Sequence, residues 1–157
     1  MNKIIVGILA FLMWLMPWSG TIYGLHAQYS FDRNATMNKI ATYVKARDVA
    51  NLESMMRPWF KNNMSNLTVK LGEFYDAIDG SITDIEKGVE GSMNDGGIHS
   101  ERLSFYVNMD DQTYYNLVIW YDVSNSKNRN EVGISSIVLS TGKLGPGYVI
   151  HFQLEVP

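Results

Sequence analysis

The sequence contains no cysteine, and this absence excludes several kinds of site. Disulfides, zinc–thiolate centres, iron–sulfur clusters and a cysteine nucleophile all require that residue. An excess of positive charge is also lacking, because 13 Lys and Arg stand against 16 Asp and Glu, which gives a net charge of −3. We therefore expect no nucleic-acid partner that is bound through a dominant positive field.

Histidine is scarce as well, and the chain has His26, His99 and His151. Zinc usually takes three or four protein ligands, so these separated residues predict no metal site, and we expect no cofactor. His151 shares a predicted strand face with Gln153 and Glu155, and a His–Glu pair can act as a general base. No nucleophile stands beside it, so we interpret this face as polar, solvent-facing strand surface.

The first thirty residues form the most apolar part of the chain. Lys3 is the only charged residue before Asp32, and the stretch 4–18 is almost entirely apolar. A basic start followed by a short apolar core is typical of a secretory signal peptide. We predict cleavage between Ala27 and Gln28, because Ala27 is small, as the position before the cut requires.

This reading makes residues 1–27 a signal peptide and residues 28–157 a single exported domain, secreted or held in the cell envelope. The alternative is an uncleaved anchor over residues 4–25, which are numerous enough to cross a bilayer of ~30 Å. Membrane contact is expected only through that segment, and only if it is retained.

Helical patterns come first in the remaining chain. Asn34 is a reasonable N-cap, and apolar residues then recur at helical spacing, namely Met37, Ile40, Ala41 and Val44. Asp48 can cap a second helix, which Pro58 should end or kink. A third helix is expected to begin at residue 65 or 66 and to end before Gly80.

Strand patterns follow the helices. Alternating or mainly apolar stretches predict β-strands at residues 82–89, 103–109, 113–123, 132–139 and 148–156. The stretch 113–123 is apolar on both faces and is expected to be central in the sheet. Residues 91–97 read GSMNDGG and predict a turn-rich connection. This order predicts an α+β domain, with the helices packed on one face of a curved antiparallel sheet of four or five strands.

Two short stretches, FYDAIDG at residues 74–80 and VGISSI at 132–137, flank a Gly/Ser-rich loop and a Tyr-rich strand. In this order they resemble an uncharacterised family of exported bacterial domains, a domain of unknown function whose members are often lipoproteins, over residues 34–140. The resemblance implies a cystatin-like cone, a fold shared with nuclear transport factors and scytalone dehydratases. It implies no activity, because that fold serves enzymes, binders and scaffolds alike. Family members commonly carry a lipidated cysteine, which this chain lacks.

Three carboxylates are the candidates for catalysis: Asp76, Asp79 and Asp84. Paired carboxylates can perform acid–base catalysis when one of them is buried enough for its pKa to rise. The alternative is that all three are solvated turn residues at the end of the third helix.

Aromatic residues are frequent on the predicted strands, and Tyr106, Trp120 and Tyr148 are the candidates for ligand binding. In a cone, inward-facing aromatics can line a cavity between sheet and helices and hold an apolar ligand. The alternative is an ordinary aromatic core with tyrosines at its rim.

These observations favour an exported, non-catalytic domain that binds a protein, a peptide or an apolar small molecule at the bacterial cell envelope. Two alternatives stay open. One is an isomerase or dehydratase that uses a pocket carboxylate, and the other is a membrane-anchored accessory subunit.

Overall fold

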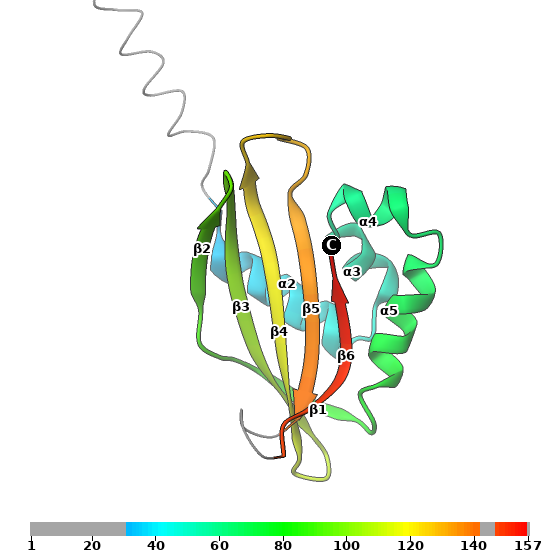
Figure 1. Cartoon of the computed structure of the whole chain (residues 1–157). Helices are drawn as coiled ribbons and strands as arrows, with labels where there is room; N and C mark the ends of the chain where they lie inside the picture. The colour runs from blue at the N-terminus through cyan, green and yellow to red at the C-terminus, as the bar shows by residue number, and fades with distance from the viewer. Residues whose placement is uncertain (1–30, 142–146, 157) are drawn as a thin grey trace, which may run out of the picture. The chain divides into compact units, whose positions relative to one another are not determined.

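The computed structural model describes residues 31–141 and 147–156, and these contain four helices followed by six strands (Figure 1). All of the helices and strands belong to one compact unit, Asp32–Pro157. The predicted signal peptide and its cleavage site at Ala27 and Gln28 lie outside the described residues. The order of helices before an antiparallel sheet confirms the α+β class.

Each of the first two helices begins at an aspartate. Helix α2 (Arg33–Lys45) is capped by Asp32, whose Oδ1 accepts a hydrogen bond from the Ala35 amide at 2.9 Å. The expected cap at Asn34 was wrong by two residues, since Asn34 is already helical. Helix α3 (Val49–Ser54) begins at Asp48, as predicted, and Asp48 Oδ1 accepts from the Asn51 amide at 3.0 Å.

Pro58 separates two short helices. Helix α3 ends at Ser54, and Pro58 is the first residue of α4 (Pro58–Asn63). Proline is tolerated there because the first-turn amide has no partner within its own helix. Helix α5 (Leu67–Asp76) follows at the expected place.

The six strands form one antiparallel sheet in the order β1-β3-β4-β5-β6, with β2 paired to β3 beyond the end of β1. The expected number was four or five. Strand β4 lies between β3 and β5, which confirms the predicted central strand. The strands are β1 (Ile82–Lys87), β2 (Gly91–Asp95), β3 (Ile98–Met109), β4 (Tyr114–Asn125), β5 (Gly133–Thr141) and β6 (Val149–Glu155).

Strand β2 is the element that the sequence prediction missed. The segment expected to be a connection is a strand up to Asp95, which pairs with Ile98 across a two-residue turn. Gly96 and Gly97 have φ angles of +53° and +88°. A two-residue hairpin turn with both φ angles positive matches the twist of the strands, and glycine adopts it without strain.

The helices and one face of the sheet share a filled apolar core. Phe60, Phe74 and Phe105 are completely or almost completely buried in it. Phe74 of α5 meets Phe152 of β6 with ring centroids 5.5 Å apart. In Figure 1, helix α2 crosses behind the strands, and the opposite face of the sheet is turned toward the viewer.

Candidate functional site

The face of the sheet that points away from α2 carries two hollows, and we call it the open face. Strand pairing aligns one row of its side chains across four strands: Arg102 on β3, Trp120 on β4, Ser136 on β5 and Glu155 on β6. Neighbouring strands lie about 4.8 Å apart, so consecutive members of this row are direct neighbours. One hollow lies on each side of the row.

The larger hollow, here called the tyrosine groove, has a volume of about 670 Å³. Tyr106 and Tyr114 pair edge to face in it, with ring centroids 6.0 Å apart. Both side chains stay well exposed, at 39% and 40%. The groove is lined by Arg102, Ser104, Tyr106, Tyr114, Asn116 and Tyr148, together with Ser140, Phe105 and aliphatic residues.

Arg102 is the charged member of the tyrosine groove. Its side chain is half-buried, and among the described residues it makes no hydrogen bond or ion pair. A guanidinium carries five N–H donors in a planar fork that matches a carboxylate. The groove therefore combines aromatic surface with an anion-seeking group that the fold itself does not use.

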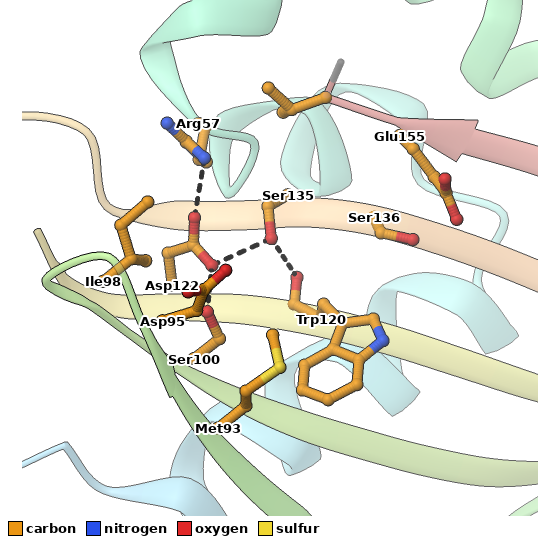
Figure 2. A pocket seen from close by; sticks show the side chains of 11 residues that line it. Arg57, Met93, Asp95, Ile98, Ser100, Trp120, Asp122, Ser135, Ser136 and Glu155 are labelled. Carbon is orange, nitrogen blue, oxygen red and sulfur yellow. Dashed lines mark hydrogen bonds and ion pairs between the residues drawn. The ribbon is translucent and has the colours of Figure 1, made fainter.

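The smaller hollow, here called the Asp122 pocket, has a volume of about 300 Å³ (Figure 2). It is lined by Arg57, Ser100, Trp120, Asp122, Ser136 and Glu155, and by further residues from β2, β3, β5 and the end of β6. The lining is both polar and apolar, since Met93, Ile98 and Val156 also contribute to it.

Asp122 is buried, and three donors surround its carboxylate. Arg57 Nη1 donates to Oδ2 at 2.7 Å, while the hydroxyls of Ser100 and Ser135 donate to Oδ1 at 2.7 and 3.0 Å. Figure 2 shows these bonds converging on Asp122. A buried carboxylate is tolerated only when it is paired and hydrogen-bonded, and this one is both.

An irregularity in the strand pairing places two serines beside each other at this pocket. Trp120 pairs with Ser136 and Tyr121 pairs with Ile134, so Ser135 is an extra residue on β5. Such a bulge redirects side chains and is common next to binding sites. Ser135 turns its hydroxyl toward Asp122, whereas Ser136 Oγ is buried without any hydrogen-bond partner among the described residues.

Arg57 reaches the pocket from the start of α4. Its backbone amide donates to the Ile134 carbonyl at 3.0 Å, and its Nε lies 3.3 Å from Glu131 Oε2. The same Glu131 oxygen accepts a hydrogen bond from the Trp59 amide at 3.1 Å. Glu131 thereby caps α4, because the side chain of the N-cap residue Arg57 does not. The network thus ties α4 to β4 and to the segment before β5.

Gly133 makes the close approach of the α3–α4 connection possible. Its φ angle is +128°, and a Cβ at this position would lie 2.7 Å from the Met55 carbonyl oxygen. Glycine is the residue that adopts this backbone and leaves the space free. The VGISSI stretch singled out in the sequence thus contributes Gly133 to this close approach and two serines, Ser135 and Ser136, to the lining of the pocket.

The three candidate catalytic carboxylates do not come together in a pocket. Asp76, Asp79 and Asp84 are all exposed. The Nζ atom of Lys45 lies 4.0 Å from a carboxylate oxygen of Asp84. The enzyme hypothesis required one of the three to lie inside a cavity, and none of them lines either of the two hollows described above.

The candidate ligand-binding aromatics divide between the two hollows. Tyr106 and Tyr148 line the tyrosine groove, and Trp120 lines the Asp122 pocket. The expected position, inward between sheet and helices, was wrong for all three. The core between sheet and helices holds other aromatic residues, among them Tyr115. Tyr121 packs against this core, and its burial raises the pKa of its hydroxyl. The two faces separate because neighbouring strand residues point to opposite sides.

Two of the three histidines, His99 and His151, lie among the described residues. His151 is exposed, as are Gln153 and Glu155, and its Nε2 lies 2.8 Å from Thr141 Oγ1. His99 lies between Asn94 and Glu101, near the start of α2. No cluster of three or more His, Asp or Glu side chains within residues 31–141 and 147–156 is arranged to hold a metal ion.

Sequence reasoning missed most of the Asp122 pocket, including Arg57, Ser100, Ser135 and Ser136. A serine pair in a strand gives no local signal of function, and Arg57 lies 65 positions from its carboxylate partner. One clue was available: Asp122 is the only charged residue of the central strand, where an unpaired buried charge is costly.

Residues 39–142 match a family described as a domain of unknown function, DUF5104. The chain belongs to this family. The match confirms the resemblance to a domain of unknown function, and it runs from within α2 to the end of β5. Both hollows are built mainly from residues that the DUF5104 family matches. Strand β6, which carries Glu155, lies after the matched segment.

A comparison with curated proteins found no match to the chain. Among the described residues, no helix is long and apolar enough to cross a membrane, and the apolar segment 4–25 is not among them.

Proposed function

We propose that this protein is exported to the bacterial cell envelope and that its domain, a cystatin-like fold, binds a segment of a partner protein on the open face without catalysis. The proposal for export rests on the apolar N-terminal stretch and on the family resemblance. The cystatin-like assignment is supported by a 13-residue helix packed against an antiparallel sheet of long strands.

The tyrosine groove is the observation that carries the binding proposal. Protein interfaces are enriched in tyrosine and arginine, which offer large rigid surfaces with polar ends. Tyr106, Tyr114 and Arg102 supply this combination on one face of a sheet whose other face is fully used by the core. The large exposed fraction of both tyrosines leaves surface that a partner can bury.

The lining of the groove favours a protein segment over a small apolar ligand. Pockets for small ligands enclose most of the ligand and are mainly apolar. Here Arg102, Ser104 and Asn116 interrupt the apolar surface. The guanidinium without a partner calls for an acidic group, so we expect the bound segment to carry aromatic or aliphatic side chains next to an aspartate or glutamate.

Two other functions have less support. An isomerase or dehydratase would need a pocket carboxylate that is free to act, and the three candidates Asp76, Asp79 and Asp84 are exposed. The buried carboxylate of Asp122 is instead held by Arg57 and two serine hydroxyls. A membrane-anchored accessory subunit rests on residues 4–25 alone, which lie outside the described residues. Mass measurement of the protein from medium and membrane fractions tests that point, because a cleaved chain begins at Gln28.

Site-specific photocrosslinking in the native host tests the binding proposal. A photoreactive phenylalanine analogue at position 106 is expected to give one discrete crosslinked protein, which disappears when Arg102→Ala is added. The same analogue at Val69, which is 61% exposed on α5, is the matched control. No crosslink at position 106, or the same products from both positions, would contradict the proposal. Extra bound mass in a native spectrum without a protein crosslink would instead support the small-ligand alternative.

A further inference from the structure

The Asp122 pocket contains polar groups that the fold leaves unused. Ser136 is only 7% exposed, yet its Oγ has no hydrogen-bond partner among the described residues. Buried polar groups in native proteins are nearly always paired, so the Ser136 hydroxyl calls for an explanation. The carboxylates of Asp95 and Glu155, which belong to exposed residues, also make no described hydrogen bond or ion pair.

These groups lie next to one another. Ser136 on β5 pairs directly with Trp120 on β4 and with Glu155 on β6, so the hydroxyl lies between an indole ring and a carboxylate. Figure 2 shows Ser136 between these two side chains on the pocket side of the sheet. Arg102 lies beyond Trp120, two strands from Ser136, at about 10 Å by strand spacing.

The charge balance of the pocket is negative. Arg57 is already paired with Asp122 and Glu131, so its charge is compensated within the fold. Within residues 31–141 and 147–156, the carboxylates of Asp95 and Glu155 form no ion pair. A group that donates hydrogen bonds and carries positive charge matches this arrangement, whereas an anion does not.

We propose that the Asp122 pocket binds a primary ammonium group on an alkyl chain. The ammonium has three donors, of which one reaches Ser136 Oγ and another the Glu155 carboxylate. The face of the Trp120 indole adds an attraction to the cation. Met93, Ile98 and Val156 line the remaining wall and contact the methylene groups.

The size of the pocket agrees with one such chain. Its volume of about 300 Å³ is at the lower end of the range for small-molecule sites. The chemistry is shared by a lysine side chain of a bound protein and by a free alkylamine. The proposal uses none of the side chains of the tyrosine groove that the proposed function depends on, so either can fail without the other.

The test titrates the processed protein, purified from its host, with two amines and one neutral analogue. The probes are Nα-acetyl-lysine methylamide, n-pentylamine and Nα-acetyl-norleucine methylamide. The readout is the NMR shift of the Trp120 indole N–H, assigned by its loss in Trp120→Phe. We expect the amines to saturate the shift and the norleucine compound to leave it unchanged. Tighter binding of the lysine compound indicates a protein side chain as the source, and tighter binding of pentylamine indicates a free amine.

Two variants separate binding from structure. Glu155→Gln should weaken amine binding about fivefold, as expected for one solvent-exposed ion pair. Ser136→Ala should weaken it roughly threefold to tenfold, the range of a single hydrogen bond. Ser136→Ala should leave the thermal midpoint unchanged or raise it, because the variant removes a buried hydroxyl that has no partner. Asp76→Asn, at an exposed position on α5, is the control and should change neither quantity.

Three results would overturn the proposal. They are the absence of a saturable shift with either amine, an equal response to the norleucine compound, and unchanged affinity in Ser136→Ala. Crosslinking at position 106 reports on the tyrosine groove separately.

Discussion

Removing the positive charge of Arg57 should destabilise the domain strongly. Arg57→Met keeps an unbranched apolar chain of similar length but leaves the Asp122 carboxylate buried without its counter-ion. The side chains of Arg57 and Asp122 are only 11% and 4% exposed, and Arg57 Nη1 lies 2.7 Å from Asp122 Oδ2. Breaking a buried pair by removing one partner costs about 3–5 kcal/mol. That is a large part of the roughly 5–15 kcal/mol that stabilises a typical domain.

Removing the other charge should cost less. In Asp122→Asn, Arg57 keeps its contact with Glu131, and the amide oxygen still accepts from a serine hydroxyl. We expect a loss of about 1–3 kcal/mol, the cost of an imperfectly satisfied polar site. The double variant should be less destabilised than the sum of the two single variants, because it leaves no unpaired buried carboxylate.

Urea unfolding followed by circular dichroism measures these differences, with equal slopes as the check that only stability has changed. Lys70→Met is the matched control, since its pair with Glu73 is exposed at 38% and 49%, and it should cost less than about 0.5 kcal/mol. The losses should be nearly the same in low and high salt, because buried pairs are weakly screened. A loss below about 1 kcal/mol for Arg57→Met, or strict additivity, would refute the reasoning.

Three further predictions follow from other parts of the molecule. Gly133→Ala places a Cβ 2.7 Å from the Met55 carbonyl oxygen at a φ of +128°, and should cost about 2–3 kcal/mol in urea unfolding. Gly72→Ala lies in α5, where no atom is within 4 Å of the new Cβ, and it should instead raise the free energy of unfolding by about 0.5–1 kcal/mol. Hydrogen bonds from Asn51 hold the pKa of Asp48 below its ordinary value of 3.8, so the Asp48 carboxylate stabilises the folded state above that pH. This contribution to stability should disappear as the pH falls through the lowered pKa of the folded state. Thermal midpoints measured from pH 2 to 7 should therefore fall more steeply at acid pH in the unmodified protein than in Asp48→Asn. Parallel curves for the two proteins would contradict the prediction.

The sequence was informative wherever one local pattern decides the structure. Met37, Ile40 and Val44 repeat at helical spacing, and all three are buried on one face of α2. The central strand was recognisable because its residues are apolar on both sides. Strand β2 escaped notice since its residues are polar and exposed, and it is defined by pairing with the long β3.

The candidate sites could not be read in the same way. Whether Trp120 points to the core or to the open face depends on strand register, and a shift of one residue reverses it. The Asp122 pocket depends further on a bulge that inserts Ser135 and on an arginine from another layer. No pattern in the sequence fixes these long-range alignments.

The two serines of that bulge show how stability and binding can be separated within one pocket. Ser135 gives its hydroxyl to Asp122 and so belongs to the network that anchors α4. Ser136 is its neighbour on the chain, yet its hydroxyl is buried without a hydrogen-bond partner in the described part of the chain, and such a group costs about 1–3 kcal/mol. An alanine at position 136 would avoid that cost with little loss of packing. The proposed ammonium group would give this hydroxyl a hydrogen-bond partner in the place where Ser136 pairs with Trp120 and Glu155.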